Sequence, residues 1–101
     1  MATNRSKIEV SVCMPAYNAS RFIGEAVESV LSQSYQPFEL LIADDGSQDH
    51  TWSVIRSYSD HPKVRIYSNG KNLGAGATRN KLVRLAQGKC ITPCDADDLM
   101  L

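Results

Sequence analysis

The amino-acid sequence predicts an α/β domain with a mostly parallel sheet and helices on both of its faces. Short apolar runs typical of strands alternate with segments of helical periodicity, in the order βαβαβαβ. Such alternation implies right-handed crossovers and parallel pairing. A length of 101 residues with 43% hydrophobic content suits one globular domain. We expect a polar tail over residues 1–8 and the domain over residues 9–101.

The first strand is expected over residues 9–14, a short apolar-rich run that Pro15 closes. Ser20 is placed to cap the helix that follows. The apolar residues of this helix recur at spacings of one, three and four, which predicts a single buried stripe. The members of the stripe are Phe22, Ile23, Ala26, Val27, Val30 and Leu31.

The second strand is expected over residues 38–43, which are almost continuously apolar. This composition is typical of a strand that is covered on both faces. Trp52 and Ile55 mark a short second helix, and residues 64–67 have the pattern of a third strand.

A third helix is expected over residues 75–87, with Gly88 as its terminating residue. Residues 90–94 are the candidate for a fourth strand. Pro93 weakens this last assignment, because proline has no N–H to donate to a neighbouring strand from a central position.

The composition excludes several classes of function. Lysine plus arginine and aspartate plus glutamate balance at eleven each, so no bulk field favours nucleic acid or an acidic membrane. Three cysteines argue against a disulfide framework, and Cys90 and Cys94 lack the spacing of a zinc site. Residues 1–7 lack the apolar core of a signal peptide. We expect a cytoplasmic domain, with peripheral contact at the inner face of the membrane left open for a longer parent protein.

Polar and glycine-rich segments follow each of the predicted strands. Residues 16–18, 44–47, 72–76 and 95–98 bring an aromatic ring, two acidic clusters and a glycine-rich helix entry. In an open parallel sheet, ligands bind beyond the carboxyl ends of the strands. The sequence therefore predicts a ligand site at this edge.

Asp95 and Asp97 are two residues apart, so in an extended segment both carboxylates face the same side. Such a pair suits Mg²⁺ or Mn²⁺, which prefer hard oxygen ligands together with phosphate and water. The alternative is a solvated acidic turn. Asp44, directly after a buried strand, is a ligand candidate, whereas Asp45 is expected to have a structural role.

Tyr17 could offer its ring face to a nucleotide base, with ordinary packing as the alternative. The helix entry at residues 74–76 would leave backbone N–H groups free for an anion. Arg79 is the cation nearest to this entry and could bind base or phosphate. An exposed helical arginine without a ligand is the alternative for that residue.

Five motifs in order resemble the inverting glycosyltransferases of family 2. They lie at residues 10–18, 29–34, 38–47, 72–80 and 95–98, and together they span nearly the whole chain after residue 8. The resemblance implies a GT-A, Rossmann-like fold and a nucleotide-diphosphate sugar donor, often uridine-based. It implies that Tyr17 stacks on the base and that Asp44 bonds the uracil ring. The residues expected to contact the nucleotide are Pro15, Ala16, Tyr17, Asp44, Arg79 and Asp95, with Asp97 as the ligand of Mn²⁺ or Mg²⁺.

In this family the base that deprotonates the acceptor hydroxyl comes from the second half of the domain. No residue here matches it, so we assign no catalytic residue. We expect a GT-A domain truncated after the fourth strand, which binds the donor but transfers sugar poorly to an acceptor glycan, lipid or other hydroxyl compound. An uncovered sheet edge also favours self-association.

Two other classes of protein share parts of this pattern. A nucleotidyltransferase would carry a glycine- and basic-rich loop after the first strand, but residues 16–21 contain no glycine and one basic residue. A receiver-type signalling domain could use Asp44 and Asp45 as a phosphorylation pocket, but it also needs a lysine where residues 95–98 are acidic.

Overall fold

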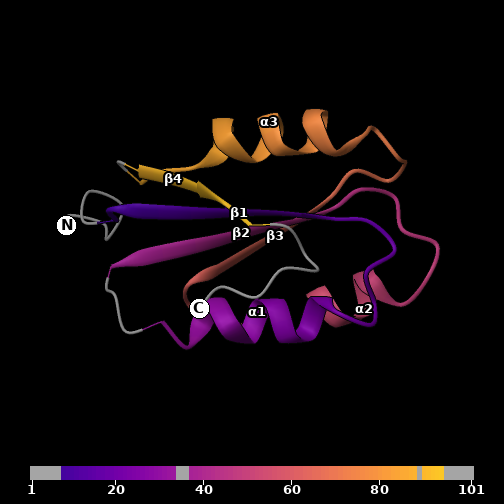
Figure 1. Ribbon diagram of the computed structural model, residues 1–101, viewed down its shortest axis with the longest axis horizontal. Coiled ribbons are helices and arrows are strands. Elements are labelled where there is room, and N and C mark those ends of the chain that lie inside the picture. The colour runs from indigo at the N-terminus through magenta and orange to yellow at the C-terminus, as the bar shows by residue number, and fades with distance from the viewer. Residues whose placement is uncertain (1–7, 34–36, 89, 95–101) are drawn as a thin grey trace.

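The computed structural model describes residues 8–33, 37–88 and 90–94. Four strands form a fully parallel sheet in the order β3-β2-β1-β4. Helices α1 and α2 cover one face of the sheet and α3 covers the other (Figure 1). This architecture confirms the α/β class and the element order predicted from the sequence. The elements are β1 (Val10–Ala16), α1 (Ile23–Leu31), β2 (Phe38–Asp44), α2 (Thr51–Arg56), β3 (Val64–Ser68), α3 (Ala75–Leu85) and β4 (Cys90–Pro93).

Two apolar layers hold the sheet between its helices. The larger layer lies under α1 and α2 and includes Met14, Leu40 and Ile42. The smaller layer lies under α3, where Leu82 packs on Cys13 and Leu41. Every residue of β2 is buried, which confirms that this strand is covered on both faces.

The start of α1 differs from the sequence prediction. Ser20 does not cap the helix, because the chain first makes a turn in which the N–H groups of Phe22 and Ile23 donate to the carbonyl oxygen of Ala19. Phe22 therefore precedes the helix, and its ring is 48% exposed with the Arg21 guanidinium over it. The rest of the predicted stripe is buried or half-buried in the larger layer.

Two prolines lie inside strands without breaking the sheet. β1 continues through Pro15 to Ala16, two residues beyond the predicted end. The carbonyl oxygen of Cys13 accepts from the N–H of Cys94 on the β4 side, so Pro15 turns its missing N–H toward that same side. The pairing of β1 with β4 ends at Cys13 and Pro93, so no hydrogen bond of the sheet is lost there. Pro93 is the last residue of an edge strand, where proline is tolerated.

The helix α3 ends at Leu85, before the predicted residue 87, and Gly88 has a different role. A side chain at Gly88 would place its Cβ 2.6 Å from the Ser11 hydroxyl oxygen, so glycine is needed where the chain passes over β1. The N–H of Gly88 donates to Ser11 Oγ at 2.8 Å, and Ser11 Oγ donates to Glu39 Oε2 at 2.6 Å. Glu39 also accepts from the N–H of Gln87 and from Arg65 Nη2.

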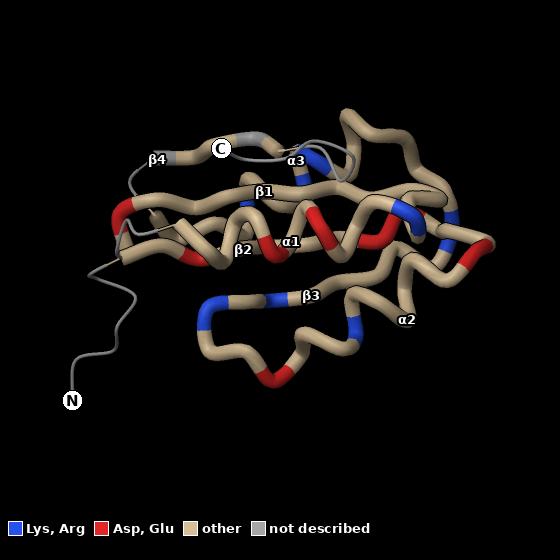
Figure 2. The backbone as a smooth tube through the Cα atoms, turned by 60° about the horizontal axis from the view of Figure 1, so that its bottom comes forward, with Lys and Arg blue, Asp and Glu red and all other residues tan. Residues whose placement is uncertain are grey.

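The helices α1 and α3 carry charges of opposite sign (Figure 2). The helix α1 carries Glu25 and Glu28, whereas α3 carries Arg79, Lys81 and Arg84 and no acidic residue. Among the described residues, no helix has the length and apolar character needed to cross a membrane.

Candidate nucleotide-binding site

The loops that follow β1, β2 and β3 meet at the carboxyl edge of the sheet and enclose a pocket of about 560 Å³. This volume lies in the range of small-molecule sites. A smaller cavity of about 160 Å³ adjoins it. The larger pocket is lined by Tyr17, Asp44, Gly46, Ser47, Gln48, Trp52, Ser68, Gly70, Lys71 and Asn72. The smaller cavity is lined by Pro15, Ala16, Tyr17, Asp45, Asn72, Gly74 and Ala75.

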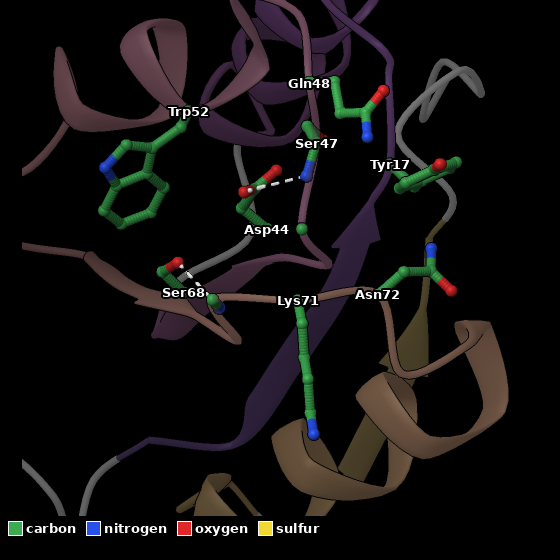
Figure 3. A pocket seen from close by; sticks show the side chains of 10 residues that line it. Tyr17, Asp44, Ser47, Gln48, Trp52, Ser68, Lys71 and Asn72 are labelled. Atoms are coloured by element: carbon green, nitrogen blue, oxygen red, sulfur yellow. Dashed lines mark hydrogen bonds between the residues drawn. The ribbon is translucent and has the colours of Figure 1, made fainter.

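Asp44 is the buried acceptor of the larger pocket. Its side chain lies between Trp52 and Tyr17 (Figure 3). Asp44 is 4% exposed, and its Oδ2 accepts from the N–H of Ser47 at 3.3 Å. Its Oδ1 is buried and has no hydrogen-bond partner among the described residues. A buried acceptor without a partner is costly, so this oxygen is the natural acceptor for an N–H group of a ligand.

Tyr17 separates the two cavities and contributes to the wall of both. Its side chain is 48% exposed, so one part of the ring is open to solvent. An exposed aromatic ring beside a buried acceptor can bind a flat ring with an N–H edge, because bases stack readily on aromatic side chains.

The first two loops are held together by hydrogen bonds between polar side chains and backbone. Asn18 has a φ of 48°, and its N–H donates to Ser47 Oγ while its Oδ1 accepts from the N–H of Gln48. Asp49 accepts from the N–H groups of Ser20 and Thr51. Burial raises the pKa of Asp49, but the hydrogen bonds from Thr51 and Ser20 outweigh this effect. The pKa therefore lies well below its ordinary value. Hydrogen bonds therefore connect these two loops at the rim of the pocket.

Asp45 connects the second loop to the third, which confirms its predicted structural role. Its carboxylate accepts from the N–H of Leu73 at 2.7 Å, the N–H of Gly74 at 3.0 Å and Asn69 Nδ2 at 2.9 Å. Burial raises the pKa of Asp45, but the bonds from Leu73, Asn69, Thr78 and Gly74 outweigh it and hold the pKa below its ordinary value.

At Gly74, these contacts correct the prediction that the entry of α3 offers free N–H groups to an anion; for residues 75 and 76 it stays a prediction. The N–H of Gly74 is occupied by the Asp45 carboxylate, an anion within the same chain. The sequence did not reveal this, because a carboxylate 29 residues away in sequence fills the position.

Gly46 allows the second and third loops to come into contact. It has a φ of +76°, and a Cβ at this position would lie 2.4 Å from both the nitrogen of Asn72 and the carbonyl carbon of Lys71. Only glycine satisfies both conditions without displacing the chain.

The structure brings together part of the set of predicted site residues. Pro15, Ala16 and Tyr17 line the smaller cavity, and Tyr17 and Asp44 line the larger pocket. Arg79 is half-buried on α3 and lines neither cavity, so its predicted contact with base or phosphate stays a prediction.

Asp95 and Asp97 lie outside the described residues. Within the described part of the chain, no group of three or more His, Cys, Asp or Glu side chains is placed to hold a metal ion. The predicted metal site therefore rests on the sequence alone.

Sequence analysis missed Trp52, Ser68 and Lys71 as residues of the pocket. Trp52 was assigned to the packing of α2, and it does pack against the larger apolar layer, but it also lines the pocket. Its position could have indicated this, because Trp52 is the second residue of α2 and the start of α2 faces the ligand edge. Ser68 and Lys71 have no such signal, since they lie in a polar stretch without a pattern that marks single residues.

The parallel sheet, the two helical layers and a polar pocket at the carboxyl ends define a nucleotide-binding domain of the GT-A type. Residues 1–349 of S. aureus TarS, solved in complex with UDP-GlcNAc, superpose with a TM-score of 0.84 at 28% identity. The match covers 91% of this chain and 27% of that one. The mannosyltransferase PcManGT from Pyrobaculum calidifontis, in complex with GDP-Man and Mn²⁺, gives a TM-score of 0.83 at 28% identity over 90% of this chain and 28% of its own.

The sequence model described as Glycosyl transferase family 2 matches residues 11–101. The chain belongs to this family, and the match decides against the nucleotidyltransferase and receiver-type alternatives. Chondroitin synthase of Escherichia coli is 44% identical over 92 residues, which cover 90% of this chain and 13% of the synthase. The Escherichia coli enzyme WfgD, a UDP-Glc:alpha-D-GlcNAc-diphosphoundecaprenol beta-1,3-glucosyltransferase, is 37% identical over 91% of this chain and 36% of its own length. The chain thus spans well under half the length of these relatives.

Proposed function

We propose that the chain is the donor-binding part of an inverting glycosyltransferase that takes a sugar from a UDP-sugar and passes it to an acceptor hydroxyl. The observation that carries this proposal is the buried, unpartnered Oδ1 of Asp44 beside the exposed ring of Tyr17 in a pocket of about 560 Å³. The UDP-GlcNAc complex of TarS supports a nucleotide-sugar donor.

The chemistry of Asp44 favours uracil over guanine. Uracil presents a single ring N–H, whereas guanine presents two adjacent donors that suit a carboxylate with both oxygens open. Because Ser47 donates to Oδ2, the acceptor left without a partner is the single oxygen Oδ1, which matches the one ring N–H of uracil. Tyr17 would stack on the ring, with Pro15 and Ala16 at the inner wall of the adjoining cavity.

The remaining proposed contacts are with the ribose, the diphosphate and a metal ion, and with the base in the case of Arg79. We assign Asp95 to the ribose, Arg79 to the base or diphosphate, and Asp97 to a bound Mn²⁺ or Mg²⁺. The Asp95 and Asp97 spacing and the Mn²⁺ in the mannosyltransferase complex support this assignment. A divalent ion at this position would offset the charge of the departing nucleoside diphosphate.

The acceptor and the catalytic base are assigned to residues beyond those described here. The proposed acceptors are a glycan, a lipid or another hydroxyl compound, consistent with the breadth of the relatives. For the parent protein we propose a cytoplasmic location, with peripheral contact at the inner face of the membrane.

The test is calorimetric titration of the chain with UDP, with and without Mn²⁺, together with the Asp97→Ala variant. We expect binding that requires the ion and is lost in the variant. Trp52 is the only tryptophan of the chain and lines the pocket, so its fluorescence gives a second readout at the site. The proposal fails if UDP, GDP and TDP all leave both signals unchanged.

A ligand variant tests Asp44 itself. UDP methylated at the ring N–H should bind about tenfold more weakly than UDP to the unmodified chain, because it cannot donate to Oδ1. In the Asp44→Ala variant the two ligands should bind alike, since the acceptor is already lost. Additive losses in this cycle would contradict a direct contact between Asp44 and the base.

A further inference from the structure

We propose that Asp45 is a positioning residue of the nucleotide pocket, which holds the loop between β3 and α3 where it forms the pocket wall. The inference rests on the proposed function, since it concerns the affinity of the same site. Asp45 lines the smaller cavity and not the larger pocket, and its carboxylate already accepts from the loop, so it would act on the nucleotide through the residues that it holds.

The wall that this loop forms has little packing of its own. Ser68, Gly70, Lys71 and Asn72 line the pocket and are exposed, and Leu73 beyond them is 47% exposed. Exposed segments with few apolar contacts open at low free-energy cost. Besides the backbone contact of residues 71 and 72 with Gly46, hydrogen bonds must therefore keep the wall in place.

The glycines of the loop do not supply that restraint. Gly70 and Gly74 both have positive φ, and no atom of a neighbouring segment lies within 4 Å of where their Cβ would be. The loop thus has backbone freedom and open space at these two glycines, although residues 71 and 72 between them contact Gly46.

Asp45 is the buried point to which the loop is attached. It is 2% exposed, and three N–H donors from residues 69, 73 and 74 converge on its carboxylate. Its carbonyl oxygen accepts from Asn72 Nδ2 at 3.4 Å. Asn69 extends the network by donating to Thr78 Oγ1 and accepting from Lys81 Nζ, so the loop is also joined to α3.

Glu39 provides a matched control at the opposite end of α3. It is also a buried carboxylate of the β2 segment with three donors, namely Ser11 Oγ, Gln87 N–H and Arg65 Nη2. Glu39 lies at the amino end of β2, whereas Asp45 directly follows its carboxyl end. The two residues share burial and three donors and differ in their distance from the pocket, although one donor of Glu39 is the charged Arg65.

The experiment compares Asp45→Asn with Glu39→Gln. Each is nearly isosteric and replaces a charged acceptor by an amide, so both should lower the melting temperature. UDP affinity in the presence of Mn²⁺ should fall about tenfold in Asp45→Asn and less than about twofold in Glu39→Gln. Equal losses in the two variants, or unchanged affinity in Asp45→Asn, would overturn the inference.

Two further measurements keep the test decisive. If Asp45→Asn does not fold, Asn69→Ala serves in its place, because it removes one of the three donors. Its affinity for UDP is expected to be about threefold weaker. Unchanged affinity would overturn the inference. Hydrogen exchange of the Leu73 and Gly74 amides should accelerate in either variant but not in Glu39→Gln. If the unmodified chain binds no nucleotide, the proposed function fails, and the positioning role fails with it, whereas loss confined to the Asp45 variants supports both.

Discussion

Replacing Gly46 by alanine should destabilise the protein through a clash between the two loops that it joins. Gly46 has a φ of +76°, and an alanine Cβ would lie 2.4 Å from the nitrogen of Asn72 and 2.8 Å from the Cα of Lys71. Ordinary contacts begin near 3.4 Å, so one loop has to move by about 1 Å. The atoms that block the methyl group are backbone atoms, which cannot rotate away as a side chain would.

The expected cost has two parts. Left-handed backbone costs a residue with a Cβ about 1–2 kcal/mol. Overpacking of this kind adds roughly 1–3 kcal/mol, so the total is about 2–5 kcal/mol. Since the whole free energy of unfolding of such domains is about 5–15 kcal/mol, the loss should be easy to measure.

Gly70→Ala separates the two parts. Gly70 has the same φ of +76°, but no atom lies within 4 Å of the position of its Cβ. Only the conformational cost of about 1–2 kcal/mol should remain there. Urea unfolding followed by Trp52 fluorescence should place the midpoint of Gly46→Ala below that of Gly70→Ala by about 1 M or more. Equal midpoints would show that the loops do not meet as described.

Three further predictions concern the hydrogen bonds of the loops and helices. The pKa of Asp45 is lowered in the folded protein, so its contribution to stability is present above its ordinary pKa and lost as pH falls through the folded pKa. The free energy of unfolding of Asp45→Asn should therefore depend less steeply on pH in acid. An unchanged slope would contradict this. The pKa of Tyr58 is raised to about 12 by burial and by its bond to Glu28. Its contribution to stability should therefore decline between about pH 10 and 12, and absorbance titration should lose the late step in Tyr58→Phe. Thr51→Val should cost about 1–3 kcal/mol in thermal unfolding, because the buried hydroxyl accepts from the N–H of Ala19 and valine leaves that donor unpaired. A smaller loss of stability in Thr51→Val than in Thr51→Ser would count against the hydrogen bond as the cause.

The fold could be predicted because the sequence pattern that indicates each helix or strand lies within that element. The apolar run of β2 and the spaced apolar residues of α1 depend only on which faces are buried. The errors fall where tertiary contacts override local pattern. Pro15 continues β1 because its missing N–H faces a side where the pairing has ended, and Gly88 is required by its contact with Ser11.

The site could be predicted in outline and not in its supports. Tyr17 and Asp44 were found because they directly follow strands that end at the ligand edge. The role of Gly46, by contrast, depends on how closely residues 71 and 72 approach it. The sequence of neither loop indicates the distance between the two loops. Asp45 was assigned a structural role correctly, but its partners in the third loop were not foreseen.

The order of the strands has a consequence for how the chain folds during synthesis. Val10 of β1 pairs with Phe38 on one side and with Cys90 on the other, which lie 28 and 80 residues further along. The central strand thus finds its first neighbour early, while its other edge stays open until nearly all of this sequence has left the ribosome. Such long-range pairing slows folding and leaves an edge open to other chains. Substitutions that delay the pairing of β1 with β4 are therefore expected to lower the yield of soluble protein.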